Sequence, residues 1–337
     1  MVESLSSMGI PPTTTVLLLV ICAISILAFQ RPGLMDRLMF RPFDILVGHQ
    51  YDRLASSALI HADLRHLLFN AYSLYAFGSS LEFVGPWLSH PAPWAWAGHP
   101  GVTSPLPRMH QLHSLNQHAV LPATSAFWWN YSGPIFVLAV FWSSVVGGSL
   151  LCLWLHRNES YSALGASGGV CGLIYAHIFL LPNSGIGLFP LPGVTVPGYV
   201  YAIGFILISV TCMRRGGDGV GHDAHLGGAI IGLGVATIFY PRQIVLQNPI
   251  LFPVVAVISV TLVFVLVRHP LLFDIGSIKS FRDDHKPNQR YQRYDEALQR
   301  AQDKEELDAL LDVVAQRGLR RLSRRDRRRL EELSRRI

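Results

Sequence analysis

The stretch YSALGASGGVCGL, residues 161–173, places one serine among glycines at the start of an apolar run. A serine in a membrane helix usually bonds back to a carbonyl one turn earlier, so Ser167 alone has a plain structural explanation. The stretch also satisfies the G-x-S-x-G pattern of soluble hydrolases, which requires a preceding buried strand. Because LHRNESYSAL precedes it and apolar segments surround it, we exclude that class.

The composition indicates a membrane protein with a polar tail. Half of the 337 residues are hydrophobic, 15% are charged, and the mean hydropathy is +0.33. A soluble domain would carry about 25% charged residues. Sixteen of the 28 lysines and arginines lie after Ser280, so the rest of the chain has few.

Seven apolar stretches are candidates for spanning helices, since a span needs about 20 apolar residues and lipid requires its backbone to be paired internally. They are residues 13–29, 64–83, 134–155, 166–181, 197–213, 223–240 and 249–267. We therefore predict an all-α polytopic membrane protein, with a six-helix bundle plus a seventh C-terminal span. The first stretch has neither a basic segment before it nor a small-residue cleavage site after it, so we expect it to be retained.

The boundaries follow from these stretches. We predict a membrane core at 1–245 with a long loop insertion at 86–133, an extra span at 246–270, and a polar, basic helical tail at 271–337. In the tail, leucines at helical spacing predict an amphipathic helix, a break at Gly318 and a short basic helix. A solvated hairpin is the simplest interpretation, and contact with anionic lipid is the alternative. No aromatic residue follows Tyr294 to stack on bases, so we predict no nucleic-acid partner.

We predict neither a metal site nor a cofactor. The insertion holds five histidines, but their spacing matches no compact ligand set and neither cysteine nor carboxylate accompanies them. They are His90, His99, His110, His113 and His118. All four cysteines fall inside predicted spans without close spacing, which favours packing over disulfides.

Polar residues inside membrane segments are costly and are functional candidates. His66 and Asn70, in HADLRHLLFN, share one helix face because they are four apart. GHDAHLGG opens another segment and includes His225. His66 and Asn70 could instead hold helices together, and Glu82 fits a structural role better than a catalytic one.

Together these residues supply the chemical groups that acyl transfer needs. Acyl transfer needs a nucleophile, a base and oxyanion donors, which Ser167, His225 and the pair His66 and Asn70 can provide. Glycines four apart, Gly168 with Gly172 and Gly228 with Gly232, leave flat helix faces that can approach closely. We expect this approach to bring Ser167 beside His225. Asp223 would point elsewhere on a helix, so we predict a dyad without an orienting acid.

The three motifs GASG, AHLGG and HxxxxHxxxN, in this combination, resemble the rhomboid intramembrane serine proteases over residues 13 to 240. The resemblance implies a serine endopeptidase that cleaves transmembrane segments, with Ser167 as nucleophile and His225 as base. It implies an oxyanion site of His66, Asn70 and the Ser167 N–H, with Gly165 and Gly168 as supporting glycines. RGGDGVGHDAHLGG and LFPLPGVTVPG look like bacterial members, which implies a multi-pass protein of the bacterial plasma membrane.

The chain departs from the family pattern in three places: the long insertion, the seventh span, and Cys171 where some members carry an aromatic ring one turn after the serine. Orientation is a further conflict. Arginines at 31, 37, 41 and 53 follow the first span, which would make that side cytoplasmic. Bacterial rhomboids resemble one another in opening the serine side outward, which we favour; a re-entrant 249–267 would return the tail to the cytoplasm.

Two other classes compete with the protease. A non-catalytic rhomboid-like adaptor would bind membrane helices, but such relatives usually lack the serine or the histidine. In a transporter, polar residues are expected to be spread over paired spans or internal repeats, whereas in this sequence they cluster at one face of the predicted bundle. The expected partners are single-span or other membrane-protein substrates and the lipid bilayer; the sequence defines no oligomeric state.

Overall fold

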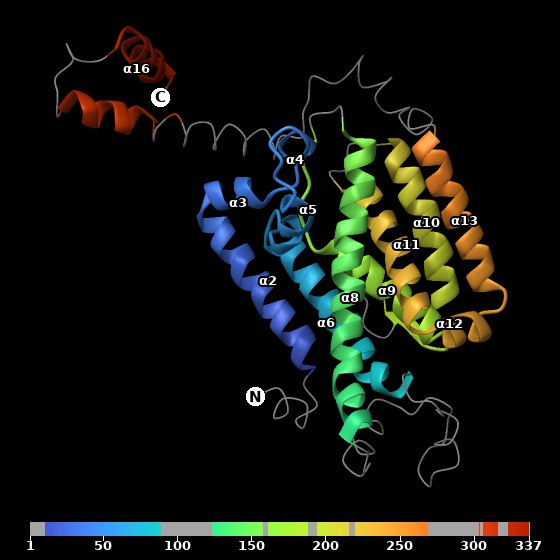
Figure 1. Ribbon diagram of the computed structural model, residues 1–337. Coiled ribbons are helices and arrows are strands. Elements are labelled where there is room, and N and C mark those ends of the chain that lie inside the picture. The colour runs from blue at the N-terminus through green and yellow to red at the C-terminus, as the bar shows by residue number, and fades with distance from the viewer. Residues whose placement is uncertain are drawn as a thin grey trace. The chain divides into compact units, whose positions relative to one another are not determined.

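The computed structural model describes residues 11–88, 123–157, 161–187, 194–215, 220–268, 303, 306–315 and 323–336. The chain divides into two compact units, residues 1–276 and 277–337. The first unit is a helical bundle (Figure 1). The histidine-rich part of the predicted insertion lies outside the described residues.

Each of the seven apolar stretches coincides with a helix. These are α2 (Pro12–Gln30), α6 (Leu64–Leu88), α8 (Ala123–Leu155), α9 (Ser167–Leu180), α10 (Gly198–Arg215), α11 (His222–Phe239) and α13 (Leu251–Arg268). By length and hydropathy together, only Pro12–Gln30 and Ser132–Leu155 qualify alone as membrane spans among the described residues. A third qualifies if α11 is joined to α12 (Pro241–Gln247), which bends away by 110°. The helical membrane bundle is therefore established, and the count of six spans plus one stays a prediction.

The predicted loop insertion is wrong at both ends. α6 continues to Leu88, and α8 begins at Ala123 rather than at Pro134, which lies inside the helix. The residues before Pro134 carry no charge and continue the apolar run, and a proline is tolerated in membrane helices when neighbouring groups satisfy the freed carbonyl.

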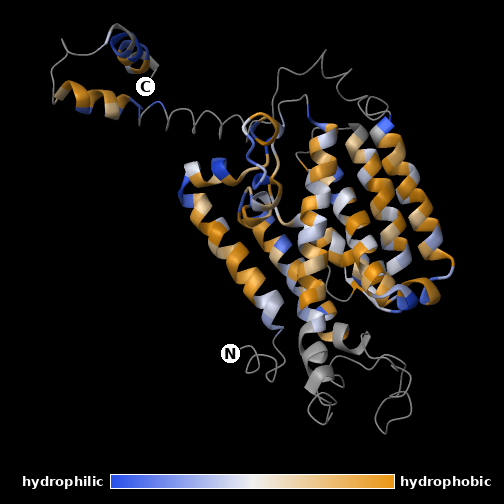
Figure 2. Ribbon diagram, in the orientation of Figure 1, coloured by the Kyte–Doolittle hydropathy of each residue, from blue (hydrophilic) through white to orange (hydrophobic). Residues whose placement is uncertain are grey.

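Helix α9 is the centre of the bundle. Every residue from Gly168 to Leu180 is buried, and the helix contacts α6, α8, α10 and α11. A helix that is apolar all round belongs in such a core. The large exposed apolar side chains lie instead on peripheral helices, for example Leu19, Leu207 and Val260. Figure 2 shows that the ribbons of these helices are coloured mostly hydrophobic, and exposed apolar side chains of this kind are suited to lipid.

Glycines set the contact between α9 and α11. A methyl group added at Gly228 would overlap the carbonyl oxygen of Gly168, and one added at Gly232 would overlap Gly172. The two backbones therefore meet directly, as the glycine spacing predicted. On α9 itself, a methyl at Gly168 would lie 3.4 Å from the Ala224 carbonyl oxygen, which is an ordinary contact. At this interface, the positions that tolerate no side chain are therefore the α11 glycines, Gly228 and Gly232.

Four short helices fold the segment between α2 and α6: α3 (Pro32–Leu38), α4 (Pro42–Leu46), α5 (Arg53–Ser56) and the 3₁₀ helix η1 (Ser57–Leu59). Arg53 is buried at their centre, where its guanidinium donates to the carbonyls of Asp36 and Met39 and lies 3.2 Å from Asp44 Oδ2. Such a buried arginine is accommodated because its donors are paired. This segment forms a structured cap rather than a plain connection.

Glu82 joins the start of α2 to α6. Glu82 of α6 accepts hydrogen bonds from the backbone N–H groups of Thr13 and Thr14, each at 2.8 Å. These are first-turn donors of α2 that have no partner in their own helix, so Glu82 has a structural role here.

The strands β1 (Gly185–Gly187) and β2 (Thr195–Pro197) pair antiparallel between α9 and α10, with Ile186 opposite Val196.

The C-terminal unit contains a helix over residues 306–315 and α16 (Arg324–Arg336). Ser323 caps α16, because its hydroxyl accepts the Asp326 N–H at 3.1 Å and donates to the Asp326 carboxylate at 2.7 Å. Arg329 of α16 donates to Glu306 of the other helix at 2.9 and 3.0 Å. The two helices are therefore linked by this ion pair, and the hairpin interpretation of the tail stays a prediction.

Candidate active site

Ser167 is the first residue of α9, and His225 lies in the first turn of α11. The Ser167 Oγ and the His225 Nε2 are 2.6 Å apart, within hydrogen-bonding distance. Both side chains are only partly buried. The glycine contact between α9 and α11 explains this closeness, since both residues lie in the first turn of a helix at the same interface.

The loop before Ser167 is held at three backbone positions. Phe40 and Ala163 exchange two hydrogen bonds, of 2.9 and 3.1 Å, and the Gly165 N–H donates to the Ser57 carbonyl at 2.9 Å. The Ala166 N–H donates to the ring Nε2 of His61 at 3.3 Å. The cap between α2 and α6 therefore fixes the point at which α9 starts.

Gly165 has a φ of +120°, a conformation open to glycine and strained for other residues. A methyl group at this position would lie 2.8 Å from His66 Cε1 and 2.9 Å from its Nε2. Gly165 is thus required both for the turn and for the approach of His66. The same position would be 3.8 Å from Ser167 Oγ, so His66 lies close to the serine.

Asn70 lies one turn after His66 on α6 and is buried. Its Nδ2 donates to the His66 carbonyl at 3.0 Å, which uses one of the two amide hydrogens. The first backbone N–H groups of α9 have no acceptor within their own helix. His66 and these N–H groups thus lie near Ser167, and Asn70 is tied to the backbone of His66 one turn further along α6.

His61, the first residue of the stretch HADLRHLLFN, is linked by the structure to the serine loop. Because its Nε2 accepts the Ala166 N–H, Nδ1 carries the proton and donates to Ser25 Oγ at 2.9 Å. Ser25 in turn donates to the Leu59 carbonyl at 2.9 Å. Burial, and secondarily the charge of His66, lower the pKa of His61 to about 3, which keeps the ring neutral. The first histidine of HxxxxHxxxN was the available signal.

The expected aromatic ring one turn after the serine is replaced by Cys171, which is buried. The His222 ring instead packs edge-on against His225, with centroids 5.9 Å apart. Asp223 faces away from His225 and lies 3.0 Å from His156 Nε2. Of the described residues, Cys152, His156 and Asp223 form the one cluster whose donor atoms could hold a metal ion.

The fold and site define a class: a polytopic helical membrane protein with a serine–histidine pair at the start of its buried central helix. Residues 48–87 and 125–242 match the family model of the Rhomboid domain, and the chain belongs to the rhomboid family. All the motif residues lie within the match, which confirms the resemblance. Residues 292–336 match a second model, described as a family of unknown function, DUF6576. No curated protein matches the chain.

Proposed function

We propose that this protein is an intramembrane serine endopeptidase of the bacterial plasma membrane, which cleaves transmembrane segments of other membrane proteins. The observation that carries the proposal is the 2.6 Å separation of Ser167 Oγ and His225 Nε2 at the end of a buried helix. Membership of the rhomboid family, whose members are typically intramembrane proteases, supports the same activity.

In the first step, His225 Nε2 takes the proton of the Ser167 hydroxyl as Oγ attacks the carbonyl carbon of the scissile peptide bond. A neutral imidazole can accept a proton at this distance without moving. The substrate helix has to unwind locally, since a helical peptide bond is shielded by its own backbone. Both side chains are partly exposed, so such an unwound segment can reach them.

The carbonyl oxygen becomes negatively charged as the bond forms. The Ser167 N–H at the start of α9 is a backbone donor for this oxyanion, and His66 and Asn70 supply side-chain donors from α6. The N-terminal end of a helix also favours negative charge. Gly165 keeps this space open by allowing the approach of His66, whereas Gly168 faces Ala224 of α11.

The carbon–nitrogen bond then breaks, and the imidazolium of His225 protonates the leaving amine. Water attacks the resulting Ser167 ester, His225 accepts a proton from that water, and the proton returns to Ser167 Oγ as the carboxyl product leaves. No cofactor takes part. His222, packed edge-on against His225, limits the rotation of the catalytic ring in both halves of the reaction.

The test is cleavage of a single-span test substrate by the purified full-length protein in liposomes. Ser167→Ala and His225→Ala should each lower the rate at least about 10,000-fold, as removing either member of a dyad does. His49→Ala, at an exposed loop residue, is the matched control and should leave the rate unchanged. If folded wild-type protein and Ser167→Ala bind the substrate equally and neither cuts it, the protein is an adaptor.

A further inference from the structure

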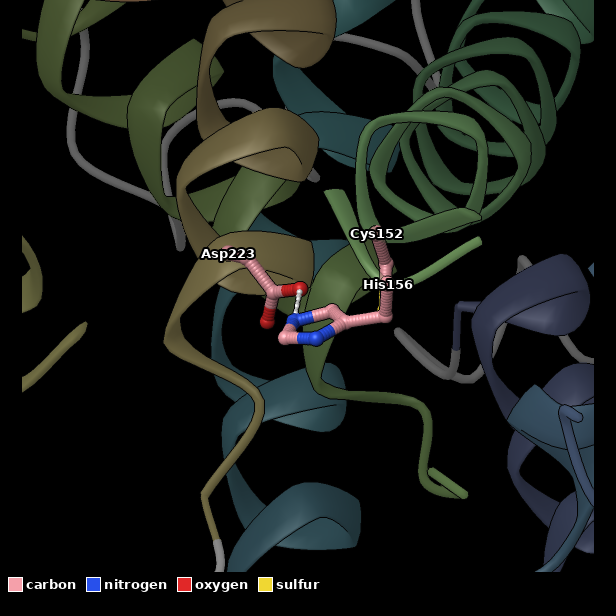
Figure 3. Close-up of side chains that lie close together, drawn as sticks. All are labelled: Cys152, His156 and Asp223. Atoms are coloured by element: carbon pink, nitrogen blue, oxygen red, sulfur yellow. Dashed lines mark ion pairs between the residues drawn. The ribbon is translucent and has the colours of Figure 1, made fainter. Parts of the chain in front are cut away.

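Three side chains of metal-binding type meet where α8 ends and α11 begins (Figure 3). Cys152 and His156 are four residues apart near the end of α8, so they project from one face. Asp223 approaches them from the first turn of α11. The Sγ, imidazole nitrogen and carboxylate oxygen all lie within 4.8 Å of one another.

The burial of this cluster raises an electrostatic problem. Cys152 is 1% exposed and Asp223 is 4% exposed, and a buried carboxylate is costly unless its charge is compensated. His156 Nε2 lies 3.0 Å from Asp223 Oδ2 and points toward it, which makes an ion pair when the ring is protonated. A neutral His156 leaves the charge of the buried carboxylate uncompensated, whereas a divalent ion bound by the three donors compensates it. A metal ion would take the place of the proton that the ring nitrogen and the carboxylate otherwise share.

The donor set suits a divalent transition-metal ion. Zinc binds thiolate, imidazole and carboxylate at about 2.0–2.3 Å with tetrahedral geometry, which separates its donors by about 3.3–3.8 Å. Small side-chain rotations close the present spread to that range. Thiolate and carboxylate together carry two negative charges, so a divalent ion makes the buried site neutral. Calcium and magnesium are disfavoured, because they prefer oxygen donors alone.

The surroundings also fit. The His156 ring stacks on Tyr161 at 3.9 Å with the planes 7° apart, which fixes its orientation. Such supporting contacts orient the ligands of metal sites. The His156 side chain is 24% exposed, which gives an ion a route of entry. Three protein donors leave a fourth position for water.

We propose that Cys152, His156 and Asp223 form a zinc-type metal site that links the end of α8 to the start of α11. Asp223 is two residues before His225, so the site would fasten the turn that carries the proposed base. The metal site does not depend on the proposed protease activity, because its test measures binding.

The experiment uses untagged full-length protein in detergent, stripped with a chelator and titrated with Co²⁺ as a spectroscopic substitute for zinc. We expect one cobalt ion with a thiolate-to-metal charge-transfer band. Cys152→Ser should abolish the band, whereas Cys22→Ser should keep it. His156→Gln and Asp223→Asn should weaken binding at least about 10- to 100-fold. Zinc should also raise the melting temperature of wild-type protein, and should not do so for Cys152→Ser.

Cobalt bound only by the histidines of the insertion would show no charge-transfer band, because histidine supplies no thiolate. The band therefore distinguishes binding at Cys152 from binding at those histidines. Cobalt that binds without the charge-transfer band, or a band that survives Cys152→Ser, would overturn the proposal. So would stripped wild-type protein, monodisperse on gel filtration, that takes up no cobalt. In that case the cluster is a metal-free ion pair of Asp223 with protonated His156.

Discussion

Single residues at the start of α9 determine what chemistry is available. Ser167 and His225 are within 2.6 Å, and His66 lies against Gly165 on the same side. Each of these residues has a plain structural explanation taken alone, and the combination at one helix end is what supports catalysis.

The oxyanion donors can be tested separately from the dyad. His66→Ala and Asn70→Ala should each lower kcat about 100- to 1000-fold, because the donors act on charge that develops only in the transition state. KM should change little. Single-turnover cleavage in liposomes measures both, with His49→Ala as the control. A change confined to KM in both variants would contradict an oxyanion role and indicate substrate binding.

His61 predicts a pH dependence of stability. The folded protein holds the ring neutral down to about pH 3, whereas a histidine in the unfolded chain takes a proton near pH 6.5. Between these values the unfolded state binds more protons, so the free energy of unfolding falls as the pH falls from about 6.5 towards 3. In thermal unfolding between pH 7 and 5, the melting temperature of His61→Gln should fall less with decreasing pH than that of wild-type protein.

Glutamine retains an acceptor for the Ala166 N–H and does not titrate, so this variant isolates the proton. His49→Gln, at an exposed residue, should follow the wild-type slope. If His61→Gln also follows that slope, the neutral buried ring is not the cause of acid sensitivity.

At the scale of elements, the α9–α11 contact positions the dyad. Gly232→Ala should push the helices apart, because the methyl would overlap the Gly172 backbone, which cannot rotate away. We expect a loss of at least about 1–3 kcal/mol in stability together with reduced cleavage. Gly234→Ala on the same helix has nothing within 4 Å and should be neutral or stabilising by up to about 1 kcal/mol. Equal melting temperatures for the two variants would refute the close contact.

The sequence predicted these elements unevenly. Helix positions and the glycine contact followed from apolar runs and four-residue spacing, since both patterns act locally. The folded cap did not, because Arg53 is buried by carbonyls of Asp36 and Met39 that no periodicity reveals. The contact of His156 with Asp223 joins residues 67 positions apart in the sequence, and nothing in either segment alone points to the other.

At the scale of the whole molecule, α13 and the arginines of the cap bear on the orientation of the protein in the membrane. α13 is one helix of 18 residues, about 27 Å long, but its apolar part Leu251–Leu266 is shorter than a candidate span, so a full crossing by α13 stays a prediction. The cap arginines have structural partners: Arg37 bonds to Asp52 at 2.7 Å, and Arg53 holds two carbonyls. Their presence is therefore explained by folding of the cap, which removes part of the reason to place it in the cytoplasm.

We accordingly predict that the Ser167 end faces outward and the N-terminus inward. Green fluorescent protein fused before Met1 should fluoresce in a bacterial host, and alkaline phosphatase fused after Ile337 should be active. An inactive phosphatase fusion together with a fluorescent fusion at Ile337 would place the tail in the cytoplasm and contradict the prediction.

The measurement that tests the central claim most directly is labelling of the purified protein with a serine-directed phosphonate, followed by peptide mass analysis. The account predicts one labelled peptide carrying Ser167 in wild-type protein, much slower labelling in His225→Ala, and none in Ser167→Ala. The result that would contradict it is a folded wild-type protein that takes no label at Ser167, or one that His225→Ala labels at the wild-type rate.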